Sequence, residues 1–270
     1  MTRVTDLVSN PTSLIPGCAN AIFTAVLAPI CAVCSTLLDE PLSGCVCFSC
    51  WRSVLPITAP LCDRCGDPLA RRSQFQIPNL ESLCAQCCSS ESAIGRARAI
   101  GEYEGALREI IHALKYAGRI SLARPLADRM RQHGREVLQD ADCVVPVPLH
   151  WRREYHRGFN QAHELARHLG PPVVEALRRR RATRAQVELP ASRRRANVTG
   201  AFAIHKGWFR GTEIRSKKLL LIDDVSTTGA TLESCATVLK DFGASEVYAL
   251  TAARVVTRRQ VQSASPIPDR

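Results

Sequence analysis

The sequence has no apolar run long enough to cross a membrane, which takes about 20 residues. The longest candidate, Ala21–Ile30, spans ten residues, has no basic segment before it and directly precedes a cluster of cysteines. These features favour a buried helix, expected around Ala19–Leu27, over a secretory signal peptide. The sequence therefore predicts no membrane span and an apolar lead-in over residues 1–30.

Aromatic residues are scarce, at 5% of the chain, and basic residues outnumber acidic ones. With 36 lysines and arginines against 25 aspartates and glutamates, the net charge is +11, which favours polyanionic ligands such as phosphates or nucleic acid. The charge is uneven, because Arg178–Arg181, Arg184 and Arg193–Arg195 form one dense basic stretch. This stretch is either a solvated loop or a contact surface for phosphates.

Cysteine, by contrast, is abundant, with 13 residues, and eight of them form four Cys-x-x-Cys pairs within the first ninety residues. The pairs are Cys31/Cys34, Cys47/Cys50, Cys62/Cys65 and Cys84/Cys87. Paired thiols at this spacing, without a secretory signal, are typical of tetrahedral Zn²⁺ sites rather than disulfides. The expected compartment is a reducing one, so the sequence predicts a cytoplasmic location.

Eight thiols suffice for two Cys₄ zinc sites, which would be structural because four protein ligands leave no open coordination position. Sequential pairing places Cys31, Cys34, Cys47 and Cys50 in one site and Cys62, Cys65, Cys84 and Cys87 in the other. A crossed pairing stays open, as do a ligand role for Cys45 or Cys88, a single metal with spare thiols, and a redox dithiol. Residues 31–92 hold few apolar side chains, so this double zinc-ribbon module needs metal to fold.

From about Gly95 onward, strand patterns alternate with helix patterns, as in a parallel sheet flanked by helices. Strands are predicted over Arg98–Tyr103, Cys143–Leu149, residues 173–178, Leu219–Ile222 and Glu246–Val255. Helices are predicted over Ala106–Leu114, Ser121–Leu138, Phe159–Leu169 and Thr231–Phe242, with a loop or hairpin over Ala203–Gly211. We expect this α/β domain to occupy residues 93–256 and to be followed by a disordered tail, 257–270.

The segment after the strand Leu219–Ile222 carries the strongest functional signal. Asp223 and Asp224 follow at the expected strand end, and a hydroxyl-rich turn with Gly229 leads into the next helix. A glycine lets the backbone approach a phosphate, and a helix N-terminus offers free N–H groups to it. The carboxylates suit sugar hydroxyls or Mg²⁺. The pattern therefore describes a site for a ribose 5-phosphate.

An ordinary strand-to-helix turn is the alternative interpretation of the same residues. In that case Thr228 or Thr231 would cap the helix, and both aspartates would be solvated.

A second motif, Val145–Gln161, ends a strand at two prolines and continues with clustered histidines and arginines. Its helix opens at Arg157-Gly158-Phe159-Asn160-Gln161. This motif suits a second anion-binding turn, next to which a diphosphate could bind. The alternative is that Asn160 merely caps a helix and the arginines are surface charge.

These motifs occur in one order along the chain, together with several shorter ones. The series is the Cys pairs, Leu114-Lys115-Tyr116-Ala117-Gly118, Pro146-Val147-Pro148-Leu149, Arg157–Gln161, Thr183 with Gln186, Arg194 with Asn197, Gly200-Ala201-Phe202, and Asp223–Thr231. It resembles the ComF family of competence-associated phosphoribosyltransferase-like proteins over about residues 28–255. The resemblance implies a type I phosphoribosyltransferase-like parallel sheet flanked by helices, preceded by a small Cys-rich zinc-ribbon module.

The resemblance also implies phosphoribosyl diphosphate, bound with Mg²⁺, as the ligand. Asp223 and Asp224 would contact the ribose hydroxyls, and Lys115 and Arg157 would lie near the diphosphate. The 5-phosphate would be held by the phosphate turn Val225, Ser226, Thr227, Thr228, Gly229, Ala230 and Thr231.

A transferase of this kind would displace diphosphate at the anomeric carbon, with Lys115, Arg157 and Arg194 stabilising the leaving charge. The acceptor is not identified, and residues 181–202 are the candidate lining of its site. A non-catalytic role in DNA uptake stays open, with single-stranded DNA bound by the arginines and by Trp51, Trp151 and Trp208. The zinc module could equally dock a competence protein.

Overall fold

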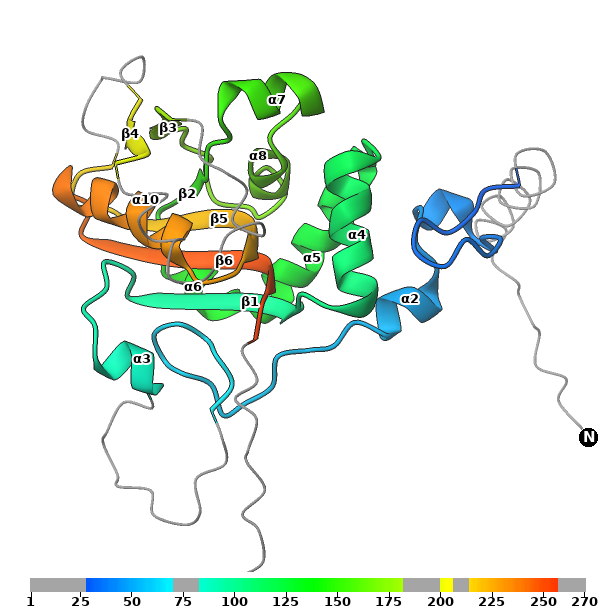
Figure 1. Cartoon of the computed structure of the whole chain (residues 1–270), viewed down its shortest axis with the longest axis horizontal. Helices are drawn as coiled ribbons and strands as arrows, with labels where there is room; N and C mark the ends of the chain where they lie inside the picture. Colours follow the sequence, from blue (N-terminus) through cyan, green and yellow to red (C-terminus); the bar gives the residue numbers. More distant parts are fainter. Residues whose placement is uncertain (1–27, 70–82, 182–199, 206–213, 257–270) are drawn as a thin grey trace, which may run out of the picture.

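The computed structural model describes residues 28–69, 83–181, 200–205 and 214–256. Its centre is a sheet of four parallel strands in the order β1-β6-β5-β2. The strands are β1 (Arg96–Glu102), β2 (Cys143–Pro146), β5 (Lys218–Ser226) and β6 (Glu246–Arg254). The predicted parallel sheet with flanking helices is confirmed (Figure 1).

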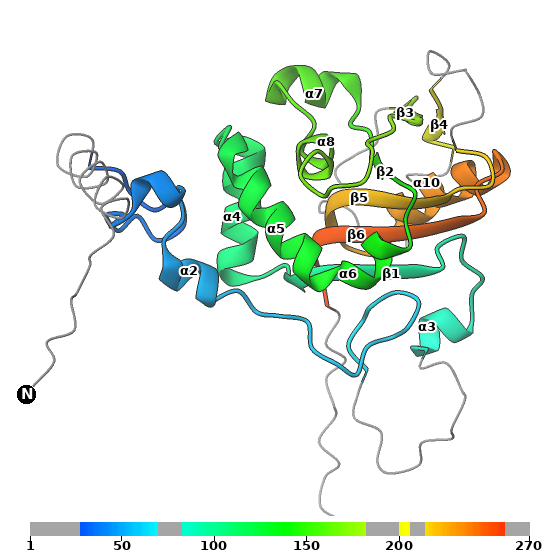
Figure 2. The ribbon, with the colours of Figure 1, turned by 180° about the vertical axis from the view of Figure 1, so that it is seen from behind.

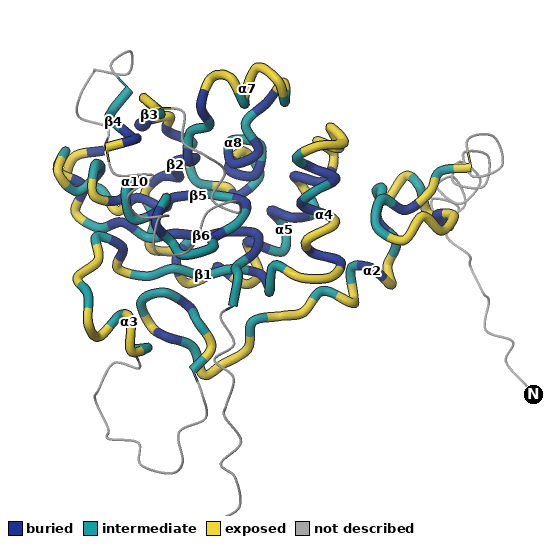
Figure 3. Tube along the Cα trace, in the orientation of Figure 1, coloured by how far each residue is buried: buried dark blue, intermediate teal, exposed yellow. Residues whose placement is uncertain are grey.

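Helices cover both faces of this sheet. One face carries α10 (Ala230–Asp241), and the other carries α5 (Ala123–His133) and α6 (Arg135–Gln139), as Figures 1 and 2 show from opposite sides. The helices α4 (Gly105–Tyr116) and α8 (Gln161–Ala166) lie on the same side as α5, which the 3₁₀ turn η3 (Ile120–Leu122) precedes. The buried residues gather in the sheet and on the helix faces that meet it (Figure 3).

The sequence of β5 explains its central place. Leu219 and Leu221 belong to the core under α10, while Leu220 and Ile222 belong to the core under α4 and α5. All four side chains are fully buried, as expected for a parallel strand covered on both faces. The sequence predicted that this strand ends at Ile222. In the structure β5 continues to Ser226, so both aspartates stand on the strand itself.

The helices differ from the prediction in two places. The single helix expected over Ser121–Leu138 is divided into η3, α5 and α6, and Gly134 lies at the break between α5 and α6. A Cβ atom built on Gly134 would lie 2.5 Å from Leu250 Cδ1, so the break lets the chain pass close to β6. The segment after β2 contains a helix that the sequence analysis read as a turn, α7 (Trp151–Arg157).

The remaining described strands form a separate antiparallel pair. Residues 173–178 were expected to be a strand, but Val173 makes only an isolated bridge to Val144, and the strand is β3 (Leu177–Arg179). It pairs antiparallel with β4 (Phe202–Ile204). The helix expected around Ala19–Leu27 and the tail 257–270 lie outside the described residues.

The cysteine-rich region forms two lobes at different places on the domain (Figure 1). The first contains η2 (Pro41–Ser43) and α2 (Phe48–Arg52), and it reaches α5 where Arg129 stacks 3.6 Å above the Trp51 ring. The second contains α3 (Ala85–Cys88) and lies against β1, where Ala97 N donates to Arg64 O at 2.7 Å. Within the described part of the chain, no helix is both long and apolar enough to span a bilayer.

We expect Gly134→Ala to lower the free energy of unfolding by about 1–3 kcal/mol, because the added methyl group would overlap the Leu250 side chain. Urea denaturation followed by circular dichroism measures the change. Gly95→Ala is the matched control, since its Cβ would meet nothing closer than the Glu246 carboxylate at 3.3 Å. An equal effect of both substitutions would contradict the packing argument.

Candidate functional site

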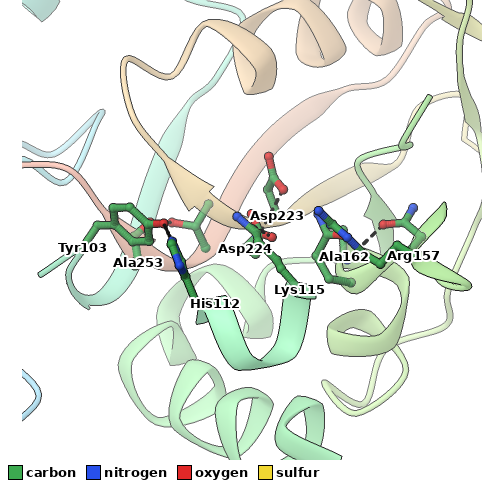
Figure 4. A network of polar contacts seen from close by, with 11 residues as sticks. Tyr103, His112, Lys115, Arg157, Ala162, Asp223, Asp224 and Ala253 are labelled. Atoms are coloured by element: carbon green, nitrogen blue, oxygen red, sulfur yellow. Dashed lines mark hydrogen bonds and ion pairs between the residues drawn. The ribbon is translucent and has the colours of Figure 1, made fainter. Parts of the chain in front are cut away.

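A nearly buried ion pair lies at the carboxyl end of β5. Lys115 stands in the last turn of α4, and its Nζ lies 3.0 Å from Asp224 Oδ2. The side chains are 15% and 6% exposed, respectively. Figure 4 shows Lys115 reaching from α4 toward Asp224, with Asp223 beside them. The structure thus brings together three of the four side chains that the resemblance assigns to catalysis.

Their charges depend on one another. Burial alone would lower the pKa of Lys115, but the attraction of Asp224 and then of Asp223 outweighs it and raises that pKa. Burial, followed by the repulsion of Asp224, raises the pKa of the Asp223 carboxyl from 3.8 to about 7. Asp223 Oδ1 also accepts a hydrogen bond of 2.9 Å from the backbone N–H of Asp224. At neutral pH the site therefore holds one firm ion pair and one carboxyl poised to gain or lose a proton.

The turn that follows is shaped by Gly229, which takes a left-handed conformation (φ 75°) and caps the N-terminus of α10. A Cβ there would meet nothing within 4 Å, so the space beside the turn is open. The Thr228 hydroxyl is buried and has no hydrogen-bond partner among the described residues. An open glycine turn with an unpartnered hydroxyl at a helix N-terminus fits a phosphate group.

The alternative of an ordinary capped turn is wrong on both counts. Gly229, not Thr228 or Thr231, occupies the N-cap position of α10. Asp224 is 4% exposed and ion-paired rather than solvated.

Arg157, the fourth predicted side chain, stands apart from the ion pair at the end of α7. It donates a short hydrogen bond to Gln161 Oε1, and its guanidinium lies 5.3 Å from the centre of the Tyr116 ring. Asn160 caps α8 as the alternative interpretation required, its Oδ1 accepting from Ala162 N at 3.0 Å. Its Nδ2 also donates to Val147 O at 3.1 Å, which holds the second turn against the end of β2.

A row of polar rings that the sequence analysis missed runs beside Lys115. Tyr103 Oη lies 3.0 Å from His112 Nε2, and the His112 ring meets the Tyr116 ring edge-on at 5.5 Å. Tyr116 in turn meets Arg157, so the row links the end of β1 to α7. The signal was available: positions 112, 115 and 116 lie on one face of a helix, three and four residues apart.

Basic side chains gather around the buried His150, which caps α7 through a 3.3 Å hydrogen bond from Arg152 N to its Nδ1. Burial, followed by the charges of Arg179, Arg152 and Arg153, lowers the pKa of His150. Arg179 belongs to the basic stretch of the sequence, but only the fold brings it near Asp223, whose charge partly offsets its burial. The predicted acceptor residues Thr183, Gln186 and Asn197, and also Arg194 and Trp208, lie outside the described residues.

The thiols of the Cys-x-x-Cys pairs converge in two groups, Cys31, Cys34, Cys47 and Cys50 in the first lobe and Cys62, Cys65, Cys84 and Cys87 in the second. The sulfur atoms lie within 4.8 Å of one another in each group, so the sequential pairing is confirmed and the crossed pairing is wrong.

The sulfur spacing fits zinc. The distances are 3.9 Å for Cys31–Cys50 and 3.7 Å for both Cys34–Cys47 and Cys65–Cys84. A tetrahedron with Zn–S bonds of about 2.3 Å has S···S edges of about 3.8 Å, whereas a disulfide needs about 2.05 Å. Backbone N–H groups also point at the ligand sulfurs, as from Cys47 N to Cys31 Sγ at 3.3 Å and from Cys84 N to Cys62 Sγ at 3.3 Å. These bonds favour the thiolate form that a metal requires.

Two neighbouring thiols stay outside these groups. Cys45 Sγ lies 3.9 Å from Ser121 Oγ, and Cys88 Sγ lies 3.8 Å from Leu83 O. Neither joins a ligand set.

Known proteins share these features. Residues 22–88 match the double zinc ribbon domain, and residues 156–267 match the phosphoribosyl transferase domain. The chain is 31% identical to the DNA utilization protein YhgH of Escherichia coli (strain K12) over 197 residues, which cover 69% of this chain and 81% of that protein. The chain belongs to the ComF family. The zinc-ribbon module and phosphoribosyltransferase-like fold implied by the sequence resemblance are thereby confirmed, with structural zinc.

Other family members are similarly distant. Competence protein F of Haemophilus influenzae is 28% identical over 77% of this chain and 90% of its own length. Competence protein ComFC of Bacillus subtilis is 27% identical over 73% of this chain and 79% of its own length. Among solved structures, a purine phosphoribosyltransferase from Pyrococcus horikoshii Ot3 covers 57% of this chain and 93% of that chain at 17% identity, with a TM-score of 0.29.

We expect this ComF protein to carry two zinc ions per chain, as measured by atomic emission on the purified protein. Cys50→Ser should lower the content to about one, because it removes a ligand of the first site alone. Cys45→Ser is the matched control and should keep both ions, since Cys45 is no ligand. Loss of a zinc ion in the control would mean that the ligand set is misassigned.

We also expect Asp223→Asn to change how stability depends on pH. The folded state binds the Asp223 proton more tightly than the unfolded chain does, because the pKa rises from 3.8 to about 7 on folding. This carboxyl therefore lowers the free energy of unfolding as the pH rises from about 4 to about 7. Relative to the wild type, Asp223→Asn should gain stability across that window and level off above it. A difference in the free energy of unfolding that does not change with pH would contradict the raised pKa of this carboxyl.

Proposed function

We propose that this protein binds phosphoribosyl diphosphate together with Mg²⁺ at the carboxyl edge of its sheet and transfers the phosphoribosyl group to an acceptor. The observation that carries the proposal is the nearly buried Lys115–Asp224 pair next to the open Gly229 turn. Withdrawing two charges from water costs several kcal/mol per ion, so the pair is weak evidence for stability, and strongly shifted pKa values cluster at functional sites. Parallel sheets bind their ligands at this edge.

Each group has a distinct task in the proposal. Asp223 and Asp224 orient the ribose through its hydroxyls, and residues 225–231 bind the 5-phosphate through backbone N–H groups and hydroxyls. Lys115 and Arg157 stabilise the charge that develops on the leaving diphosphate. Mg²⁺ would bridge the diphosphate oxygens and supply further positive charge. We keep the division of the chain at residues 31–92 and 93–256, and a cytoplasmic location, as parts of this proposal.

A second candidate function is single-stranded DNA binding, in keeping with the names of the DNA utilization and competence relatives. It is favoured by α7, a helix in which no residue is buried. Trp151 and Tyr155 are 64% and 83% exposed, and Arg152 lies 5.2 Å from the Trp151 ring. Exposed rings beside arginines suit stacked bases and phosphates. By contrast, Trp51 is held by Arg129 and belongs to the fold.

The two functions separate by their dependence on salt. DNA affinity should fall steeply with salt concentration and should respond to charge reversal in Arg178–Arg181, whereas binding of phosphoribosyl diphosphate should depend on Mg²⁺ and on Asp224. Docking of a competence protein through the zinc module stays a prediction, for which the exposed Phe48 and Leu37 of the first lobe offer apolar surface.

We expect Asp224→Asn to weaken the binding of phosphoribosyl diphosphate by about 10- to 100-fold in calorimetric titrations with Mg²⁺. A charge-assisted hydrogen bond contributes about 1.5–3 kcal/mol, and the change removes the charge but little volume. Asp128→Asn on α5 is the matched control, because its exposed pair with Arg131 lies outside the site. Unchanged affinity in Asp224→Asn, with the fold intact by circular dichroism, would contradict the proposal that Asp224 binds the ribose hydroxyls.

A further inference from the structure

The second zinc lobe is fitted tightly against the sheet. Gly66 follows the ligand Cys65 and takes a positive φ of 73°, and a Cβ there would lie 2.6 Å from Ala97 O. Arg64, between the ligands Cys62 and Cys65, accepts a 2.7 Å hydrogen bond from Ala97 N through its carbonyl. The metal-binding turn thus lies directly on β1, with no room for a side chain at position 66.

An ion pair joins the same turn to the end of β6. Asp67, two residues after Cys65, accepts from Arg254 Nε at 2.5 Å, and the side chains are 25% and 12% exposed. Burial alone would lower the pKa of Arg254, but its bond to Asp67, and then the nearby Cys65 and Cys84 sulfurs, raise it. Four thiolates around Zn²⁺ leave about two negative charges uncompensated. The guanidinium therefore bonds Asp67 and lies where its charge can offset part of the negative charge of a zinc-loaded site.

Arg254 is also the cross-strand partner of Ser226, where β5 enters the phosphate turn. The backbone N–H of Val255 donates to Ser226 O at 2.9 Å. Arg254 therefore bonds the metal-binding turn of residues 62–67 through its guanidinium and lies beside Ser226, the first hydroxyl residue of the phosphate turn, in the sheet.

A small cavity lies between the two turns. It is lined by Cys65, Ser226, Arg254 and Thr251, and by Leu232 in the first turn of α10. The Ser226 hydroxyl is buried and has no hydrogen-bond partner in the described parts of the chain. Ser226 thus lines the cavity on the side of the zinc lobe, while the space beside Gly229 is open.

We propose that Asp67 and Arg254 are a positioning pair through which zinc in the second site holds the phosphate turn in its binding conformation. Loss of the pair would free the end of β6 and, through it, Ser226 and the residues that follow. Binding energies linked in this way are reciprocal, so a ligand on the turn should also slow the loss of zinc. The predicted effect of a ligand on zinc loss rests on the proposed binding of phosphoribosyl diphosphate.

The first zinc site provides an internal control. Its lobe contacts α4 and α5 through α2 and the Trp51–Arg129 stack, and none of its ligands lines the cavity beside Ser226. A general effect of zinc on folding would involve both sites, whereas the proposed coupling is specific to the second.

The test compares Asp67→Asn with Asp39→Asn, an exposed aspartate of the first lobe, in the full-length, zinc-loaded protein. Hydrogen exchange of the peptide covering residues 224–232 is measured by mass spectrometry. We expect exchange to be at least about tenfold faster in Asp67→Asn and unchanged in Asp39→Asn. We also expect Asp67→Asn to weaken phosphoribosyl diphosphate binding about tenfold, and the ligand to slow chelator-driven zinc release from the wild type.

The outcomes separate the two proposals. Unchanged exchange at residues 224–232 in Asp67→Asn overturns the coupling. Faster exchange in a protein whose wild type binds no phosphoribosyl diphosphate supports the coupling and overturns the proposed function. If Asp67→Asn loses its zinc, Arg254→Lys replaces it, because that change keeps the charge but not the guanidinium geometry. Faster exchange with both zinc ions retained is then the supporting result, and unchanged exchange again overturns the coupling.

Discussion

The Lys115–Asp224 ion pair is the constraint around which the domain is built. A buried charge is tolerated only when a partner of opposite sign is held at contact distance, and here the two partners come from elements more than one hundred residues apart. The sheet order puts β5 beside β6 and β2, and the fully buried face of α4 fixes that helix against the same core. The apolar packing of α4 against the sheet therefore sets the distance between the Lys115 ammonium group and the Asp224 carboxylate.

The same pair makes the neighbouring Asp223 sensitive to its surroundings. With Lys115 already paired with Asp224, the second carboxyl lies partly buried beside a like charge, and its pKa rises to about 7. An incoming sugar hydroxyl or cation would act on a group whose proton is loosely held. One carboxylate is thus paired with the lysine, and the other has a pKa near neutrality, a combination that is frequent at functional sites.

Zinc stabilises the cysteine-rich N-terminal region, as the apolar core stabilises the sheet. The two lobes have few large buried side chains, and their backbones are held by N–H···S bonds and by the converging thiols. Yet the lobes are not equivalent, because the first packs beside α4 and α5 while the second lies on β1 and meets β6 through Arg254. This difference gives the second site a direct physical route to the phosphate turn.

The elements of the fold and the thiol pairs could be predicted where neighbouring residues in the sequence determine them, but the contacts of the site could not. Leu219–Ile222 and the helix from Ala106 to Leu114 have apolar patterns that allow few structures, and the Cys-x-x-Cys spacing identifies thiol pairs without a fold. The family resemblance placed Lys115 and Asp224 in one site but did not predict their contact, because no local rule links positions so far apart. Nothing local indicated that Arg179 would approach Asp223, or that Asp67 would meet Arg254. The α7 helix was missed because its start is capped by a histidine and its residues bury no apolar face, so neither a usual cap nor a periodic pattern marks it. Local patterns thus specified the elements, whereas the charges that give the site its chemistry are set by the packing of those elements.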